Sequence, residues 1–163
     1  QGTGCLLMAC LAELPQATGI GIDISAEAVM LASANADRHG LGGRGRFRQA
    51  DFAADLTGHG LFDLILSNPP YIPSGNIVAL DTDVRHFDPL AALDGGWDGL
   101  DCWRILCPQI AILLKDEGTA FVEIGAGQGK AVVRLGKASK LQLAKSFADL
   151  SGHERCLQFQ KEI

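Results

Sequence analysis

Leu61-Phe-Asp-Leu-Ile-Leu-Ser67 is followed in this chain by Asn68-Pro69-Pro70-Tyr71. The apolar run predicts a buried parallel strand. The two prolines end that strand, because each lacks an N–H and holds φ at about −65°. Ligands of open α/β sheets bind at the carboxyl ends of the strands. The tetrapeptide therefore presents an amide side chain, rigid carbonyls and an aromatic ring that suit a planar NH2 group. The alternative is a plain loop that ends the strand.

The elements expected around this strand alternate between helices and strands. The hydrophobic pattern and the capping residues predict helices over 7–14, 26–39, 103–114 and 128–138, and further strands over 18–23, 46–50, 119–124, 141–148 and 156–162. Ser25 is the expected N-cap of the second helix, and Pro108 is expected to kink the third. The long segment Pro73–Asp98 is expected to be a functional loop. This order predicts an α/β fold with a doubly wound, mostly parallel sheet. The last two strands have no helix between them and should pair antiparallel.

Composition restricts the class of protein. The 163 residues carry a net charge of −5, which argues against tight nucleic-acid binding, although four arginines cluster between residues 38 and 48. Five cysteines without a Cys-x-x-Cys pair predict reduced thiols instead of disulfides or a zinc site, and no metal is expected. Neither a membrane span nor a signal peptide is visible. These features predict one cytoplasmic domain over residues 1–163.

Three further motifs follow one another along the chain, beginning with its glycine-rich start. Gly2-Thr3-Gly4 precedes the first helix, where glycines let the backbone approach a ligand closely. Asp23 lies about 20 residues further on, which suits bonding to ribose hydroxyls. Asp51-Phe52 follows the strand predicted over 46–50, where a carboxylate and an aromatic face can hold adenine. Together these residues predict an adenosine-containing cofactor.

Each of these motifs also has a simpler interpretation. The glycines alone can form a turn, Asp23 alone can interact with a helix dipole, and Phe52 alone can belong to the core. The later run from Gly125 to Lys130 looks like a phosphate-binding loop. Ile124 and Ala131 nevertheless occupy the positions where that motif needs glycine and a hydroxyl, so a turn is predicted there.

The chain resembles the catalytic domain of the HemK-type peptide chain release factor glutamine methyltransferases, within the class I S-adenosylmethionine-dependent superfamily. The resemblance spans essentially the whole chain. It rests on the stretches 2–4, 23–25, 51–52, 62–72, 83–89, 93–101, 123–128 and 149–155. The chain departs from the family pattern at Leu6, where a further glycine is usual, at Phe52 in place of tryptophan, and at Asp83 and Asp88 in place of glutamate.

The resemblance implies a Rossmann-like methyltransferase sheet, S-adenosylmethionine as cofactor, and a glutamine of a peptide chain release factor as substrate. The residues that it implies for the cofactor are Gly2, Thr3, Gly4, Asp23, Asp51, Phe52 and Asn68. The Asn68 side-chain oxygen and the Pro69 carbonyl would accept the two N–H groups of the substrate amide. Tyr71 would pack against the amide plane, and Pro70 would complete the substrate-binding turn.

Two alternatives remain open at this point. One is an amino-methyltransferase that acts on adenine or guanine of DNA or RNA, since the same turn serves such enzymes. The other is a catalytically silent cofactor-binding fragment, which Leu6 and the start of the chain suggest.

The resemblance also implies that a helical domain and an apolar strand precede Gln1. That strand would lie between the strands that end at Asp23 and Ser67. Without it, these two strands are expected to pair directly, to exchange strands with a partner chain, or to stay apart, with weak cofactor binding in each case.

Overall fold

The computed structural model describes residues 2–79 and 89–162. These residues form two compact units, unit 1 (Gln1–Asp55) and unit 2 (Leu56–Ile163), and each is described by itself. The expectation of one domain over residues 1–163 stays a prediction.

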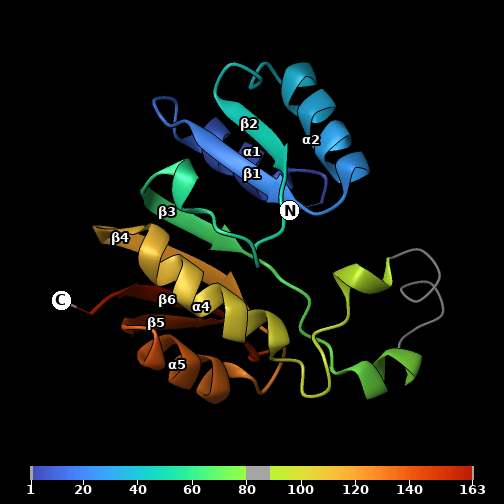
Figure 1. The fold of residues 1–163 in the computed structure, drawn as a ribbon, viewed down its shortest axis with the longest axis vertical. Helices are drawn as coiled ribbons and strands as arrows, with labels where there is room; N and C mark the ends of the chain where they lie inside the picture. Colours follow the sequence, from blue (N-terminus) through green and yellow to red (C-terminus); the bar gives the residue numbers. More distant parts are fainter. Residues whose placement is uncertain (1, 80–88, 163) are drawn as a thin grey trace. The chain divides into compact units, whose positions relative to one another are not determined.

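Unit 1 contains two helices and a two-stranded parallel sheet (Figure 1). Its elements are α1 (Cys5–Glu13), β1 (Gly19–Asp23), α2 (Ala26–Arg38) and β2 (Gly45–Gln49). The core of unit 1 gathers Leu11, Ala36 and Leu41, against which Phe47 packs. The Ser25 side chain accepts a hydrogen bond from the Ala28 N–H at 3.1 Å, which confirms Ser25 as the N-cap of α2.

Unit 2 contains a four-stranded mixed sheet with strand order β3-β4-β6-β5. Its helices and strands are β3 (Phe62–Ser67), α4 (Asp101–Leu113), β4 (Leu114–Glu123), α5 (Gly129–Ala138), β5 (Leu141–Ala148) and β6 (Glu154–Lys161), with short 3-10 helices η1 (Thr57–His59), η2 (Ser74–Ala79) and η3 (Leu90–Ala92). The pair β3–β4 is parallel, whereas β6 pairs antiparallel with both β4 and β5. The α/β fold with parallel pairs and an antiparallel C-terminal strand is thus confirmed.

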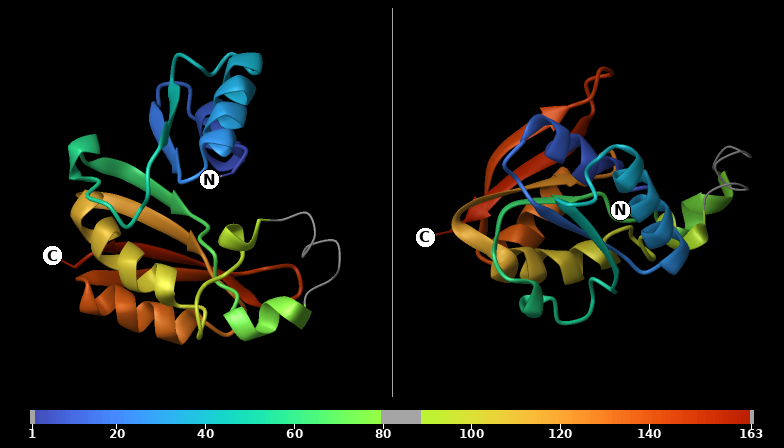
Figure 2. Two further views of the ribbon diagram at one scale, coloured as in Figure 1. Left: turned by 45° about the vertical axis from the view of Figure 1, so that its right-hand side comes forward. Right: turned by 90° about the horizontal axis from the view of Figure 1, so that it is seen from above.

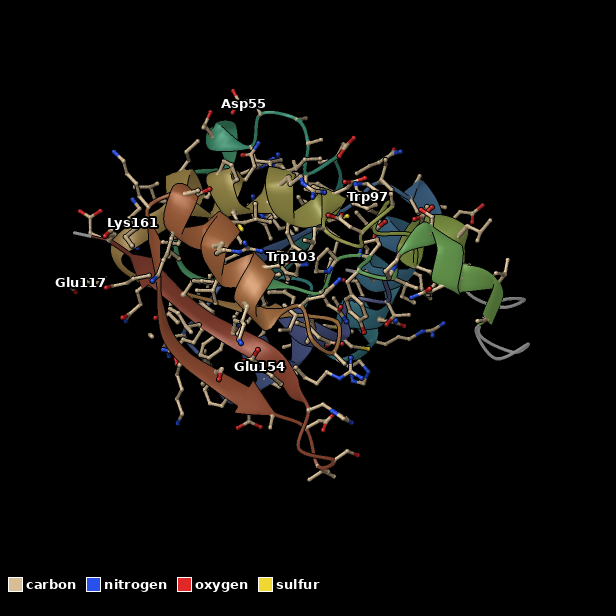
Figure 3. All side chains as sticks on the ribbon, turned by 90° about the horizontal axis from the view of Figure 1, so that it is seen from below. Asp55, Trp97, Trp103, Glu117, Glu154 and Lys161 are labelled. Carbon is tan, nitrogen blue, oxygen red and sulfur yellow. The ribbon has the colours of Figure 1, made fainter. Side chains whose placement is uncertain are left out.

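Helices α4 and α5 pack against each other on one face of this sheet (Figure 2). The stripe predicted for α4 is buried as expected: Trp103 is fully buried, as are Cys107 and Ile110. Figure 3 shows Trp103 in the middle of unit 2 next to α5, with Glu117 and Lys161 at the edge of the unit. Val122 and Leu157 of the sheet are fully buried as well.

One predicted boundary is wrong. Leu114 was expected at the end of a helix, with the next strand beginning at Thr119, but Leu114 has an extended backbone and is the first residue of β4. The side chain of Leu114 is fully buried, so its hydrophobicity marked a core position correctly. Burial alone does not distinguish a helix end from a strand start, because both place an apolar side chain inside. The early part of β4 is irregular, with a shift in register against β3 between Phe62 and Leu64.

In the described part of the chain, β1 pairs with β2 within unit 1, and β3 pairs with β4 within unit 2. The arrangement expected between the strands that end at Asp23 and Ser67 stays a prediction. No helix within residues 2–79 and 89–162 combines the length and the hydropathy needed to cross a bilayer.

Candidate active site

The Asn-Pro-Pro-Tyr turn begins directly after β3, at the carboxyl end of this strand. Asn68 is exposed, whereas Pro69 is buried beneath it. Within the described residues, no hydrogen bond engages the Asn68 side chain. The turn therefore combines a buried proline with an exposed asparagine side chain. This placement agrees with the one predicted from the strand and the two prolines.

Tyr71 turns its ring toward the end of β4. Its hydroxyl donates to Glu123 Oε1 at 3.3 Å. Burial raises the pKa of Tyr71 above its ordinary value, and the negative charge of Glu123 adds to the rise, while Arg155 opposes it. The phenol therefore stays protonated at neutral pH and acts there as a hydrogen-bond donor.

A small cavity of about 170 Å³ adjoins this turn within unit 2. Tyr71 and Pro73 line one side, and Gly125, Gln128 and Arg155 line the other. The cavity brings the segment after β3 together with the segment after β4. It has room for a few atoms of a ligand next to the aromatic ring.

The chain beyond Tyr71 is held by a second segment. Ile72 forms a parallel bridge with Asp94, in which the Ile72 N–H donates to Leu93 O at 3.1 Å and the Gly95 N–H donates to Ile72 O at 2.9 Å. Asp94 in turn accepts the Ser74 hydroxyl at 2.7 Å. The expected long loop thus carries a short ladder that fixes the segment following the turn. The stretch 80–88, which includes Asp83 and Asp88, lies outside the described residues.

In unit 1, Asp23 holds the glycine loop. Its Oδ2 accepts the Gly2 N–H and its Oδ1 accepts the Ser25 N–H, both at 2.9 Å. Burial opposes ionisation, hydrogen bonds from the Ser25 and Gly2 N–H groups favour it, and the pKa of Asp23 lies below its ordinary value. The carboxylate thus stays charged next to the Gly2-Thr3-Gly4 loop, and its bonding to ribose hydroxyls stays a prediction.

Glycine is required at position 4 by the backbone and by packing. Gly4 has φ of 82°, and a Cβ there would lie 3.0 Å from both the Ala32 Cβ and the Phe47 ring. Thr3 is exposed, and its carbonyl accepts Asn35 Nδ2 at 3.2 Å. Leu6, which stands where the family usually has a further glycine, lies on α1 with 49% of its surface exposed.

Asp51 and Phe52 follow the strand adjacent to Asp23. The parallel register pairs Asp23 with Gln49, and the Ala50 N–H donates to Asp23 O at 2.9 Å. Asp51 Oδ1 accepts the Ala53 N–H at 2.8 Å, so it forms a local turn, and Phe52 is half-buried. Unit 1 therefore brings together the predicted glycines and Asp23, and places Asp51 just past the neighbouring strand end.

Sequence reasoning assigned no role to Gln128 or Glu123, which contact Tyr71 in unit 2. Both residues lie in the stretch 123–128 that carries the family resemblance, but the sequence of that stretch does not indicate which residues they contact. The contacts join residues more than 50 positions apart, at 57 for Gln128 and 52 for Glu123. Only a tertiary structure can show them. The predicted turn after β4 is confirmed, since the Gln128 N–H donates to the Gly125 carbonyl at 3.1 Å.

The sequence matches proteins of known family. The model of the methyltransferase small domain matches residues 1–83. The chain is 50% identical, over 156 aligned residues, to a release factor glutamine methyltransferase of Rhodospirillum rubrum. The alignment covers 96% of this chain and 47% of that protein. It is 44% identical, over 154 aligned residues, to a release factor glutamine methyltransferase of Caulobacter vibrioides. That alignment covers 94% of this chain and 53% of the relative.

The fold matches solved methyltransferases as well. An O-methyltransferase from neocarzinostatin biosynthesis, solved in complex with S-adenosylmethionine, superposes with a TM-score of 0.65 at 16% identity, over 98% of this chain and 46% of that one. The chain spans about half the length of the curated relatives described above. Since the family model covers 83 of the 163 residues, and the fold agrees with it, the chain belongs to the methyltransferase small domain family.

Proposed function

We propose that this protein transfers a methyl group from S-adenosylmethionine to the side-chain amide nitrogen of a glutamine in a peptide chain release factor. The observation that carries the proposal is the exposed Asn68 amide after β3, in a chain 50% identical to a release factor glutamine methyltransferase. The structural relative with bound S-adenosylmethionine supports the choice of cofactor.

The chemistry requires help from the protein, because a carboxamide nitrogen is a poor nucleophile. Its lone pair is delocalised into the neighbouring carbonyl. In the proposed reaction, the Asn68 side-chain oxygen and the Pro69 carbonyl accept the two N–H groups of the substrate. These bonds orient the nitrogen and stabilise the positive charge that develops on it during transfer. Tyr71 packs against the amide plane, and Pro70 keeps the turn rigid.

When bound, the cofactor would supply the methyl group from its sulfonium: the S–CH3 bond breaks as the N–CH3 bond forms, S-adenosylhomocysteine leaves, and the methylated amide nitrogen loses one proton to water. In unit 1, Asp23 and the Gly2-Thr3-Gly4 loop would hold its nucleoside, and Asp51 and Phe52 would hold the adenine. The bond from the Gly2 N–H to Asp23 supports this assignment, because it places the carboxylate directly at the glycine loop. Asn68 is proposed to contact the cofactor as well as the substrate.

The test is methyl transfer with three acceptors. The complete gene product is incubated with S-adenosylmethionine and, in parallel, with a purified bacterial peptide chain release factor, adenine-containing DNA, and RNA. Mass spectrometry of proteolytic peptides should locate one added methyl group on a glutamine side chain of the release factor. Methylation of the nucleic acids alone would instead support the amino-methyltransferase. Cofactor binding by calorimetry without any transfer would support the silent binding fragment.

A further inference from the structure

The side-chain amide of Gln128 connects three segments of unit 2. Its Nε2 donates to the Tyr71 carbonyl at 2.9 Å and to the Gly99 carbonyl at 3.1 Å. Its Oε1 accepts the Gly125 N–H at 3.0 Å. A neutral amide offers two N–H donors and one carbonyl oxygen, and all three are used here. A carboxylate cannot make the same set of bonds, because it has no N–H to donate.

Three glycines leave the space that this arrangement needs around Tyr71. A Cβ on Gly95 would lie 2.8 Å from the Tyr71 Cα, and a Cβ on Gly125 would lie 3.1 Å from the Tyr71 ring. A Cβ on Gly99 would meet the Tyr71 carbonyl and would lie 2.6 Å from Gln128 Nε2. The backbone of Tyr71 is therefore enclosed by residues that carry no side chain.

The bonds of Gln128 are not explained by helix capping. Gln128 stands at the N-cap position of α5, but its side chain makes no capping hydrogen bond to that helix. The amide instead extends to Tyr71, which is 57 residues away in the sequence. A residue that served α5 alone would bond to the free N–H groups of its first turn.

We propose that Gln128 is a positioning residue for methyl transfer, which holds the Asn68–Tyr71 turn through the Tyr71 carbonyl. This inference rests on the proposed function and deepens it. Asn68 and the Pro69 carbonyl can orient a substrate amide only if the backbone between them and Tyr71 is fixed. Gln128 fixes the Tyr71 end of this backbone segment. The Tyr71 ring then lies next to Gly125, and its hydroxyl donates to Glu123.

The first test replaces Gln128 by methionine, which has a similar length and no charge but cannot make the three bonds. Gln142→Met is the matched control, because Gln142 lies on β5 and bonds only weakly to Lys161 O at 3.4 Å. With the complete gene product and a bacterial release factor, kcat of Gln128→Met should fall about 10²-fold, as expected when reacting groups are misplaced by about 1 Å. Affinity for S-adenosylhomocysteine should stay unchanged, and the control should keep its kcat.

The second readout does not depend on the reaction. Tyr71 is the single tyrosine of the 163 residues, so a ring-labelled tyrosine gives a direct NMR signal, assigned by its loss in Tyr71→Phe. In the parent protein the signal should titrate above the ordinary tyrosine range, because of burial and Glu123, with Arg155 opposing. In Gln128→Met the titration should move toward the ordinary range, because the ring is no longer held.

A second pair of variants covers the case in which Gln128→Met does not fold. Gly99→Ala places a Cβ against the Tyr71 carbonyl and Gln128, whereas a Cβ on Gly152 meets nothing within 4 Å. The two glycines have similar φ values of 75° and 82°, so alanine strains both backbones alike. Only Gly99→Ala should lower kcat and shift the Tyr71 signal.

The outcomes separate the two proposals. If the parent protein does not methylate the release factor, the proposed function fails, and the Tyr71 signal still shows whether Gln128 holds the turn. If the parent is active and Gln128→Met, or Gly99→Ala in its place, keeps both kcat and the Tyr71 titration, the positioning role is overturned.

Discussion

Asn68 has an exposed side chain, and Pro69 directly after it restricts its backbone to extended conformations. Asn68→Ala should abolish methyl transfer, because the side-chain oxygen that would accept a substrate N–H is lost. Affinity for S-adenosylmethionine should change by less than about tenfold, or about 1.4 kcal/mol, since most of the proposed nucleoside contacts lie in unit 1. Turnover assays and calorimetry measure the two effects.

Asn76→Ala is the matched control for this substitution. Asn76 is also an exposed asparagine of unit 2, and it lies on η2 outside the Asn-Pro-Pro-Tyr turn. The control should keep the parent activity. Retention of most of the activity by Asn68→Ala would falsify the role proposed for this amide.

Asp23 is proposed to bind the cofactor, whereas Asn68 is proposed to bind the substrate amide. Asp23→Ala should weaken binding of S-adenosylhomocysteine by about 2–3 kcal/mol, because hydrogen bonds to a charged group contribute about 1.5–3 kcal/mol each. The substitution also frees the Gly2 and Ser25 N–H groups, so the glycine loop loses an anchor. Calorimetric titration gives the affinity, and thermal unfolding shows how much stability is lost.

Asp116→Ala serves as the control for Asp23→Ala. Asp116 lies on β4 with a largely exposed side chain and interacts with Lys161. Its loss should leave the affinity unchanged. If Asp23→Ala binds S-adenosylhomocysteine as the parent does, Asp23 is a structural residue that supports the loop and the start of α2.

Among the elements, α2 allows a direct test of its cap. Ser25→Ala should lower the free energy of unfolding by about 1 kcal/mol, because the Ala28 N–H loses its acceptor. Ser33→Ala is the control inside the same helix, where the hydroxyl donates to the Val29 carbonyl at 2.8 Å. Alanine has the higher helix propensity, so this control should be neutral or slightly stabilising. Equal losses in the two variants, measured by urea unfolding, would contradict the capping role.

At the scale of the whole molecule, the two units should differ in local stability. In the described residues, β4 and β6 each pair on both edges, whereas β1 and β2 pair only with each other. Most of the fully buried large side chains also belong to unit 2, including Trp103 and Phe159. Amide hydrogens of β1 and β2 should therefore exchange faster than those of β4 and β6, because opening unit 1 exposes less apolar surface. Equal protection of the two sheets in a native-state exchange experiment would refute this order.

The sequence by itself located most of the elements, because their signals are local. Pro15 follows the end of α1, Ser25 caps α2, and Asn68-Pro69-Pro70 ends β3, each within a few residues of the position predicted. The same local logic selected Gly2-Thr3-Gly4 and Asp23 as parts of a cofactor site, and the Gly2 N–H donates to Asp23. Their role toward the cofactor stays a prediction. These features depend on φ preferences and on hydrogen bonds between near neighbours or adjacent strand ends.

Only the tertiary structure decided the boundary at Leu114 and the surroundings of Tyr71. The hydrophobic pattern marks Leu114 as buried in a helix or a strand alike, and pairing with Phe62 selects the strand. The amide of Gln128 could bond to any nearby carbonyl. It reaches Tyr71 and Gly99 because the segments after β3, before α4 and after β4 meet in one place. Such contacts depend on how distant parts of the chain pack, which no pattern of near neighbours specifies.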